Sequence, residues 1–206
     1  DDGYQDNSYY GAVLTANVDL GFAKLTVIPA WRKTDLDFVG YASSFLIDVT
    51  EVSDQLSLEA RLANQSDKLK WVLGAYYFTE DTTANQRYDQ GSNGTRILSD
   101  LQTRSYAVFG EATYSVSDRF RLTGGLRYTS DNKQQVTEAH TLPFVGFVPP
   151  AFPNFTPIIL DLRTDALSDV NFNKSTWKAG IEFDAADRSL LYATVATGFK
   201  SGILYS

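Results

Sequence analysis

The sequence predicts an all-β protein of about eight long antiparallel strands, joined as four hairpins. Three observations carry this prediction: apolar and polar residues alternate over long stretches, short polar turns alternate with longer connections, and no stretch is apolar enough for a membrane helix. The chain has 206 residues, of which 43% are hydrophobic, yet its mean hydropathy is slightly negative. The apolar residues are therefore spread along strands and do not form blocks.

The clearest hairpin covers residues 106–133. The apolar side of its first arm holds Tyr106, Val108, Gly110, Ala112, Tyr114 and Val116. The apolar side of its second arm holds Phe120, Leu122, Leu126 and Tyr128. Each side recurs at every second position, which is the period of a strand. Between the arms, Ser117-Asp118-Arg119 predicts a tight turn in which the Asp side chain accepts a backbone hydrogen bond.

Two earlier hairpins repeat this design. The first joins an arm over residues 7–18 to one over residues 22–38, across a turn at Asp19-Leu20-Gly21. In its second arm Pro29 cannot donate to a ladder, which predicts a bulge or a local edge. The next hairpin turns at residues 65–68.

The fourth hairpin has an apolar side formed by Trp177, Ala179, Ile181 and Phe183. A turn at residues 185–188 leads to a last arm over residues 189–206. Alternation does not decide the faces of this arm. If Lys200 lies on the wet side, then Leu191, Val195 and Phe199 point outward.

Longer connections are predicted between the hairpins, around residues 40–49, 89–94 and 141–169, and the last of them holds five of the six prolines. The arms would then run to about 12–18 residues, whereas strands of soluble domains cluster near 5–6. Because a tilted strand crosses a bilayer in about 9–11 residues, such arms would span a membrane and project beyond it.

A transmembrane β-barrel and a soluble sandwich or solenoid are the two architectures that fit this pattern. Arm length, alternating connection length and aromatic residues beside one apolar face favour the barrel. These aromatic residues are Tyr10, Trp31, Trp71, Tyr77, Tyr106, Tyr114, Tyr128 and Trp177. Every backbone group in a bilayer must be paired, so the eight arms either close on themselves or form an arc of a larger barrel.

Three runs resemble the barrel repeats of TonB-dependent receptors of the Gram-negative outer membrane. They are FGEATYSVSDRFRLTGGLRYTSDNK, LSLEARLANQSDKLKWVLGAYYFTED and the terminal LYATVATGFKSG. The most specific piece is residues 198–202, which the family usually continues with a Phe-Asn-like pair, whereas Ile203-Leu204 follows here. The resemblance assigns residues 1–206 to the barrel domain, with no recognisable plug domain.

This resemblance implies an arc of a 22-stranded barrel and a transport function in the cell outer membrane, with no enzymatic activity and no resident cofactor. The implied partners are outer-membrane lipid, the plug domain of the same protein, the TonB energy-coupling complex and a scarce nutrient. Such nutrients include ferric siderophores, cobalamin-like cofactors and glycans. The chain ends in Tyr205-Ser206, whereas these barrels typically end on an aromatic residue, so an internal part of the barrel is expected.

Other function classes find little support in the sequence. The net charge of −7, with dispersed Lys and Arg, argues against a nucleic-acid surface. A single histidine, His140, and the lack of cysteine argue against a zinc or iron site of the His/Cys type. The pairs Asp35/Asp37 and Glu80/Asp81 are interpreted as polar strand ends, because no calcium-loop spacing accompanies them.

Two groups of residues are candidates for function. Charged residues on the polar strand faces would point into the lumen, where they line the wall, dock a plug or contact a ligand: Glu59, Arg61, Arg121, Arg127, Lys178 and Glu182. The Phe/Pro-rich connection would offer an external apolar surface to a hydrophobic or aromatic ligand through Phe144, Phe147, Phe152 and Phe155. The tight turns are expected on the periplasmic side and the longer connections outside.

Two alternatives stay open at this stage. In the first, the chain forms a small closed eight-stranded outer-membrane barrel with a structural or adhesion role, and residues 1–18 pair with residues 189–206. In the second, the chain is an outer-membrane hydrolase that uses His140 in a catalytic triad. The simpler interpretation of His140 is an exposed or loop-packed histidine.

Overall fold

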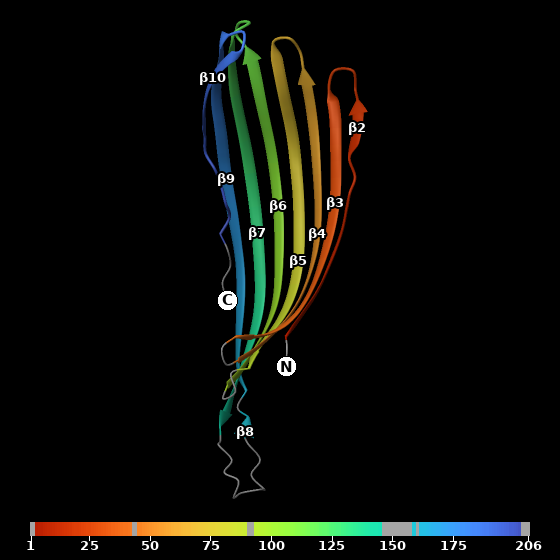
Figure 1. Cartoon of the computed structure of the whole chain (residues 1–206), viewed down its shortest axis with the longest axis vertical. Helices are drawn as coiled ribbons and strands as arrows, with labels where there is room; N and C mark the ends of the chain where they lie inside the picture. The colour runs from red at the N-terminus through yellow and green to blue at the C-terminus, as the bar shows by residue number, and fades with distance from the viewer. Residues whose placement is uncertain (1–2, 43–44, 90–92, 146–157, 160, 203–206) are drawn as a thin grey trace, which may run out of the picture.

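The computed structural model describes residues 3–42, 45–89, 93–145, 158–159 and 161–202. They form one open antiparallel sheet in the order β1-β3-β4-β5-β6-β7-β9-β10, with β2 beside β3 and β8 beside β7 (Figure 1). The two arms of each predicted hairpin are thus neighbours in the sheet, as predicted. Within the described part of the chain, no helix is long and apolar enough to cross a membrane.

Six of the strands are far longer than those of an ordinary soluble domain. The strand bounds are β1 Tyr4–Val13, β2 Ala16–Asp19, β3 Lys24–Ala42, β4 Phe45–Gln65, β5 Leu69–Asp89, β6 Asn93–Ser115, β7 Phe120–Val145, β8 Ile158–Ile159, β9 Leu162–Ala186 and β10 Ser189–Ala196. The long strands contain 19 to 26 residues, which exceeds even the predicted arms.

The four tight turns lie together at one end of the sheet, where they are predicted (Figure 1). In the first turn the Asp19 carboxylate accepts a hydrogen bond from the Gly21 amide at 2.8 Å, and Gly21 has a φ of +83°, which a side chain would strain. In the third turn the prediction chose the wrong acceptor. The Ser117 hydroxyl, and not Asp118, accepts from the Arg119 amide at 3.4 Å.

The predicted connections at the other end of the sheet are too long. β3 continues to Ala42 and β4 begins at Phe45, so the expected loop over residues 40–49 is mostly strand. In the second region β5 reaches Asp89 and β6 begins at Asn93, and in the third region β7 reaches Val145 and β9 begins at Leu162. The alternation of apolar and polar residues is weak there, because each face of the sheet carries both kinds of residue. The backbone pairing continues nevertheless.

Pro29 interrupts one ladder without shifting its register. Val13 pairs with Ala30 and Ala16 pairs with Val27, so no residue is inserted between β1 and β2. The Leu14 amide donates to the Pro29 carbonyl at 3.1 Å, but Pro29 has no N–H to return the bond. The strand break between β1 and β2 therefore replaces the predicted bulge.

The two ends of the sheet do not pair with each other. Among the described residues β1 pairs only with β3, and β10 pairs only with β9. The small closed eight-stranded barrel is therefore wrong, because it requires residues 1–18 to pair with residues 189–206. The last arm is also shorter than expected, since β10 ends at Ala196, and its Leu191 and Val195 lie on the same face as Phe183 and Ala179.

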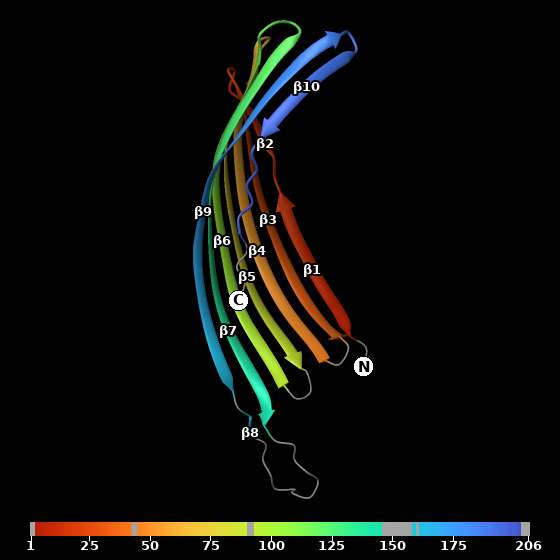
Figure 2. The ribbon, with the colours of Figure 1, turned by 90° about the vertical axis from the view of Figure 1, so that its left-hand side faces the viewer.

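The sheet is bowed along its length into a trough, as Figure 2 shows. Side chains converge on the inside of such a curve, so the concave face should hold the better buried residues. The buried residues within long strands are Ser53, Ala84, Ala107 and Thr137. The strand register puts all four on the same face, which is the face of the charged candidates. The polar face is therefore the concave face.

Candidate functional site

The convex face carries an apolar belt next to the tight turns. Its residues are Leu25, Val27, Leu56, Leu58, Leu62, Leu69, Leu73, Val108, Leu122, Leu126, Ile181, Leu191 and Val195. Many are exposed, as Leu126 is at 72% and Leu73 at 56%. On each central strand the belt is about nine residues long, which is the length that a tilted strand needs to cross a bilayer.

Aromatic residues mark the far edge of this belt. They are Trp31, Tyr77, Tyr106, Tyr128 and Trp177, and the rings of Tyr77 and Tyr106 lie 5.0 Å apart. The next convex-face residue on each of these strands is polar: Lys33, Thr79, Arg104, Ser130 and Ser175. An apolar band bounded by aromatic residues is the lipid-facing pattern of membrane barrels.

The concave face opposite the belt is held by ion pairs. Arg121 on β7 contacts Glu182 at 2.8 Å and Asp184 at 2.7 and 3.0 Å, so one guanidinium joins two carboxylates of β9. Arg61 and Glu59, which are two residues apart on β4, contact each other at 3.1 Å. These are charge-assisted contacts that also orient the side chains along the wall.

Lys178 reaches across a whole strand to find its partner. Its Nζ lies 3.1 Å from the Glu111 carboxylate on β6, although β7 lies between β6 and β9. The residue of β7 in that row is Gly125, which pairs with both Glu111 and Lys178 and has no side chain to block the contact. The glycine thus makes a three-strand ion pair possible.

Arg127 has a different environment from the other candidates. Its guanidinium lies 5.6 Å from the centre of the Phe109 ring, and its Nε donates to the Thr129 hydroxyl at 3.1 Å. The Phe109 ring in turn covers Gly74 on β5. All six charged candidates therefore lie on the concave face, but they form separate contacts along it and do not converge on one point.

Beyond the level of the belt the concave face mixes aromatic and charged side chains. One row across the strands contains Phe78, Ser105, Asp131 and Phe172. The Ser105 hydroxyl donates a hydrogen bond to the Asp131 carboxylate at 2.6 Å. Glu80 lies in the neighbouring row, and its carboxylate accepts hydrogen bonds from Gln55 and Ser53. We call the set Phe78, Glu80, Asp131, Lys133 and Phe172 the concave patch.

The two predicted carboxylate pairs behave differently. Glu80 lies on the concave face and Asp81 on the convex face, where it accepts from Gln102 at 2.6 Å, so these neighbours cannot share a cation. Asp35 and Asp37 do share the convex face. In the described residues no group of three or more His, Cys, Asp or Glu side chains is arranged to hold a metal ion.

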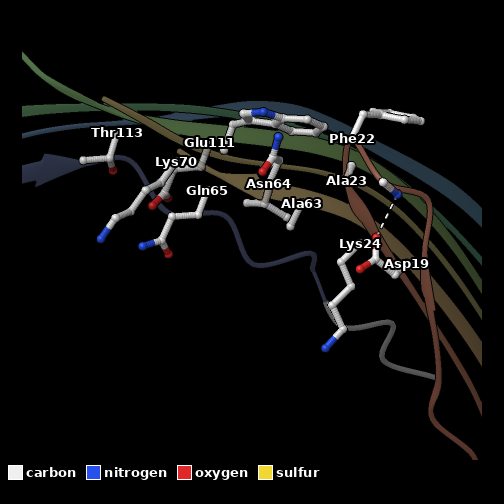
Figure 3. Close-up of a pocket in the computed structure, with 13 residues that line it drawn as sticks. Asp19, Phe22, Ala23, Lys24, Ala63, Asn64, Gln65, Lys70, Glu111 and Thr113 are labelled. Carbon is white, nitrogen blue, oxygen red and sulfur yellow. Dashed lines mark hydrogen bonds between the residues drawn. The ribbon is translucent and has the colours of Figure 1, made fainter. Parts of the chain in front are cut away.

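A hollow of about 540 Å³ lies at the turn end of the sheet. Figure 3 shows that Phe22 lies on one side of the ribbon, while Lys24 and Lys70 extend on the other. The hollow therefore crosses the rim between the two faces. Its lining combines the aromatic residues Phe22 and Trp71 with polar side chains of the other face, such as Lys24, Lys70 and Glu111. We therefore interpret it as the border of the apolar belt and not as a ligand site.

Comparison with known proteins agrees with this geometry. The family model for "TonB dependent receptor-like, beta-barrel" matches residues 1–206. The chain belongs to the TonB-dependent receptor β-barrel family. The family resemblance, the all-β fold and the interpretation of the sheet as an arc of a receptor barrel are thereby confirmed. The family consists of receptors and transporters, which also agrees with the expectation that the chain is not an enzyme.

Solved structures of receptors share the fold at low sequence identity. The ferric yersiniabactin uptake receptor FyuA from Yersinia pestis has a TM-score of 0.78 and 16% identity, over 93% of this chain and 28% of FyuA. The siderophore receptor PiuA from Acinetobacter baumannii has a TM-score of 0.67 and 13% identity, over 95% of this chain and 33% of PiuA. The chain thus spans about a third of these receptors. The comparison with curated protein sequences found no match.

The remaining candidates of this receptor barrel are four phenylalanines of the Phe/Pro-rich connection and His140. Phe147, Phe152 and Phe155 lie outside the described residues, and of Phe144 only the backbone, paired with Ile159, is described. His140 lies on β7 with Glu138 and Asp161 as its hydrogen-bond partners, which is not the Ser-His-Asp arrangement of the hydrolase alternative.

Sequence reasoning missed Asp184 and Glu111, which complete the ion pairs of Arg121 and Lys178. Alternation shows that both acids lie on the polar face, but it does not show which strands stand opposite each other. The useful signal would have been Gly125, since a glycine between two charged rows permits a contact across its strand.

Proposed function

We propose that the chain forms part of the wall of an outer-membrane, TonB-dependent receptor that imports a scarce nutrient. The observation that carries this proposal is the match of all 206 residues to the receptor barrel family, on a sheet whose convex face has a membrane-length apolar belt. In this arrangement the concave face, with its ion pairs, lines the lumen.

The partners in this proposal follow from the two faces and the two edges of the sheet. The convex belt contacts outer-membrane lipid, and the edges of β1 and β10 pair with further barrel strands, because unpaired backbone groups are costly in a bilayer. The concave face holds the plug domain, and the TonB complex supplies energy from the periplasm. The tight turns then lie on the periplasmic side.

We infer that the ligand is a ferric siderophore. The two similar receptors, FyuA and PiuA, are a ferric yersiniabactin uptake receptor and a siderophore receptor. The concave patch offers chemistry suited to such a ligand, since Phe78 and Phe172 lie in the same row as Asp131, next to the row that holds Glu80 and Lys133. Cobalamin-like cofactors and glycans are the other outcomes of the test.

The test is uptake by the source bacterium under iron limitation. Removing the protein should reduce uptake of one labelled ferric siderophore to background, and the intact protein should restore it only in cells with a working TonB complex. Labelled cobalamin and glycans serve as the competing ligands. Uptake that continues in cells without a working TonB complex would contradict the proposal. The proposal would also be contradicted if removal of the protein left the uptake of every labelled ligand unchanged.

A second arm of this test concerns the external connection. Replacing Phe144, Phe147 and Phe152 together with Ser should weaken ligand capture while the barrel still assembles, because loop residues contribute little to wall packing. The matched control is Leu167→Ser, which removes an exposed apolar side chain from the convex face of β9 beyond the belt. Equal capture by both variants would show that the connection is not the ligand site.

A further inference from the structure

His140, the single histidine of the chain, lies near the far end of β7 on the convex face. It is far from the apolar belt, and β7 continues only to Val145. Its cross-strand neighbours are Arg96 on β6 and Arg163 on β9. The imidazole is well covered, with 20% of its side chain exposed.

Both ring nitrogens of His140 contact carboxylates. Nε2 lies 2.6 Å from the Glu138 carboxylate, and Nδ1 lies 2.9 Å from that of Asp161. A neutral imidazole carries a hydrogen on only one nitrogen, so it satisfies one of these contacts and turns a lone pair toward the other carboxylate. The protonated imidazole donates to both. The observed geometry is therefore that of a charged histidine.

We propose that His140 is a proton-operated clamp that ties Asp161, the residue before β9, to the end of β7. In the protonated state one imidazolium bridges Glu138 on its own strand and Asp161 on the incoming chain. Loss of the proton breaks one of the two bonds and lets the last pairs of the β7–β9 ladder open more often. This inference does not depend on the proposed transport function.

Carboxylates outnumber the basic groups that contact them around the clamp. Arg163 on β9 contacts Glu138 at 2.9 Å and Asp165 at 2.8 Å, and Arg96 on β6 donates to Asn85 at 3.2 Å. Three carboxylates, those of Glu138, Asp161 and Asp165, thus contact one guanidinium group, that of Arg163, and the imidazole. Deprotonation of His140 leaves one more negative charge of this cluster uncompensated.

The direction of the pH effect follows from these contacts. Hydrogen bonds to Glu138 and then to Asp161 raise the pKa of His140 above its ordinary value of 6.5. A raised pKa means that the stabilisation is complete below pH 6.5 and is lost as the pH rises through the pKa of the folded state. Between pH 8 and pH 6 the clamp should therefore strengthen.

The test uses the whole protein that carries this chain, in detergent micelles. The His140 imidazole is titrated by NMR, with its signal assigned through a His140→Gln variant. We expect a pKa above 6.5 in the natural protein, a lower one in Asp161→Asn, and no change in Asp169→Asn. Asp169 is the matched control, because it also lies on the convex face but contacts Asn132 and Gln134 instead of His140.

Hydrogen exchange provides the second readout. After correction for intrinsic rates, amides of residues 139–142 and 162–165 should exchange about two- to fivefold more slowly at pH 6 than at pH 8, as expected for one solvent-accessible ion pair. The difference should vanish in His140→Gln. A pKa at or below 6.5 in the natural protein, or the same pH dependence in the variant, would overturn the proposal.

Discussion

Arginine at position 126 should severely destabilise the barrel in a bilayer. Leu126 lies on the convex face of β7 inside the apolar belt, pairs with Gly110 on β6 and Trp177 on β9, and is 72% exposed. On that face it would contact lipid between the middle of the belt and its aromatic edge, where a charged side chain costs about 1–3 kcal/mol, between the values for the midplane and the interface of a barrel surface. We expect Leu126→Arg to lower the denaturant midpoint in lipid vesicles by the equivalent of that free energy.

The matched control for this variant is Val136→Arg. Val136 is on the same strand and the same face, is 52% exposed, and lies beyond the aromatic edge of the belt, where its cross-strand neighbour on β6 is Asp100. A surface arginine in water should change the free energy of unfolding by no more than about 0.5 kcal/mol. Equal losses in the two variants would mean that the belt does not face lipid.

A side chain at position 74 should disturb the concave wall. The Phe109 ring lies over Gly74, so that an added Cβ would come within 2.8 Å of two ring carbons and closer to a third. The ring would have to move. This movement would disturb its contact with the Arg127 guanidinium, which lies 5.6 Å from the ring centre. Gly74→Val should therefore cost about 1–3 kcal/mol of unfolding free energy, as other overpacked sites do.

Gly124→Val is the control for this second variant. Gly124 is also a strand glycine, but it lies on the convex face and a Cβ there meets no atom within 4 Å. Neither glycine has a positive φ, so a side chain strains the backbone at neither position. The two denaturant midpoints are compared in the same vesicles. A larger loss for Gly124→Val than for Gly74→Val would contradict the packing described for Phe109.

The membrane-level part of the fold could be predicted from alternation. Within the belt each strand has one face toward apolar surroundings and one toward polar ones, so the sequence of β7 from Phe120 to Tyr128 shows both faces directly. The same holds for the tight turns, where Asp19 and Gly21 form a recognisable local hydrogen bond.

The outer part of the strands could not be predicted in the same way. Beyond the belt the convex face becomes polar while the concave face gains aromatic residues such as Phe78 and Phe172. The contrast between the faces therefore weakens and partly reverses, and the residues resemble loops although their backbones stay paired. For this reason the region around Gly40 was predicted as a connection and is strand.

The candidate site was predicted by face but not by contact. Alternation put Arg121 and Glu182 on one face, and the register makes them direct neighbours. It did not show the second partner, Asp184, because that contact depends on the reach of the guanidinium along the next strand. Which residues stand opposite each other depends on the register of two neighbouring strands, so the sequence of one strand alone does not predict such a contact.

The central claim is that the convex belt lies in the bilayer and the concave face does not, and labelling along β7 tests it most directly. The chain contains no cysteine of its own. Single cysteines are placed in turn at positions 122, 123, 126, 129, 134 and 136 of the whole protein, with any cysteine elsewhere in it replaced, and are spin-labelled in lipid vesicles. The account predicts preferential access by oxygen, which concentrates in lipid, only at positions 122 and 126. It also predicts access by a water-soluble nickel reagent at positions 134 and 136. Labels at 122 and 126 that meet only the water-soluble reagent, or a label at 123 or 129 that meets lipid instead, would contradict it.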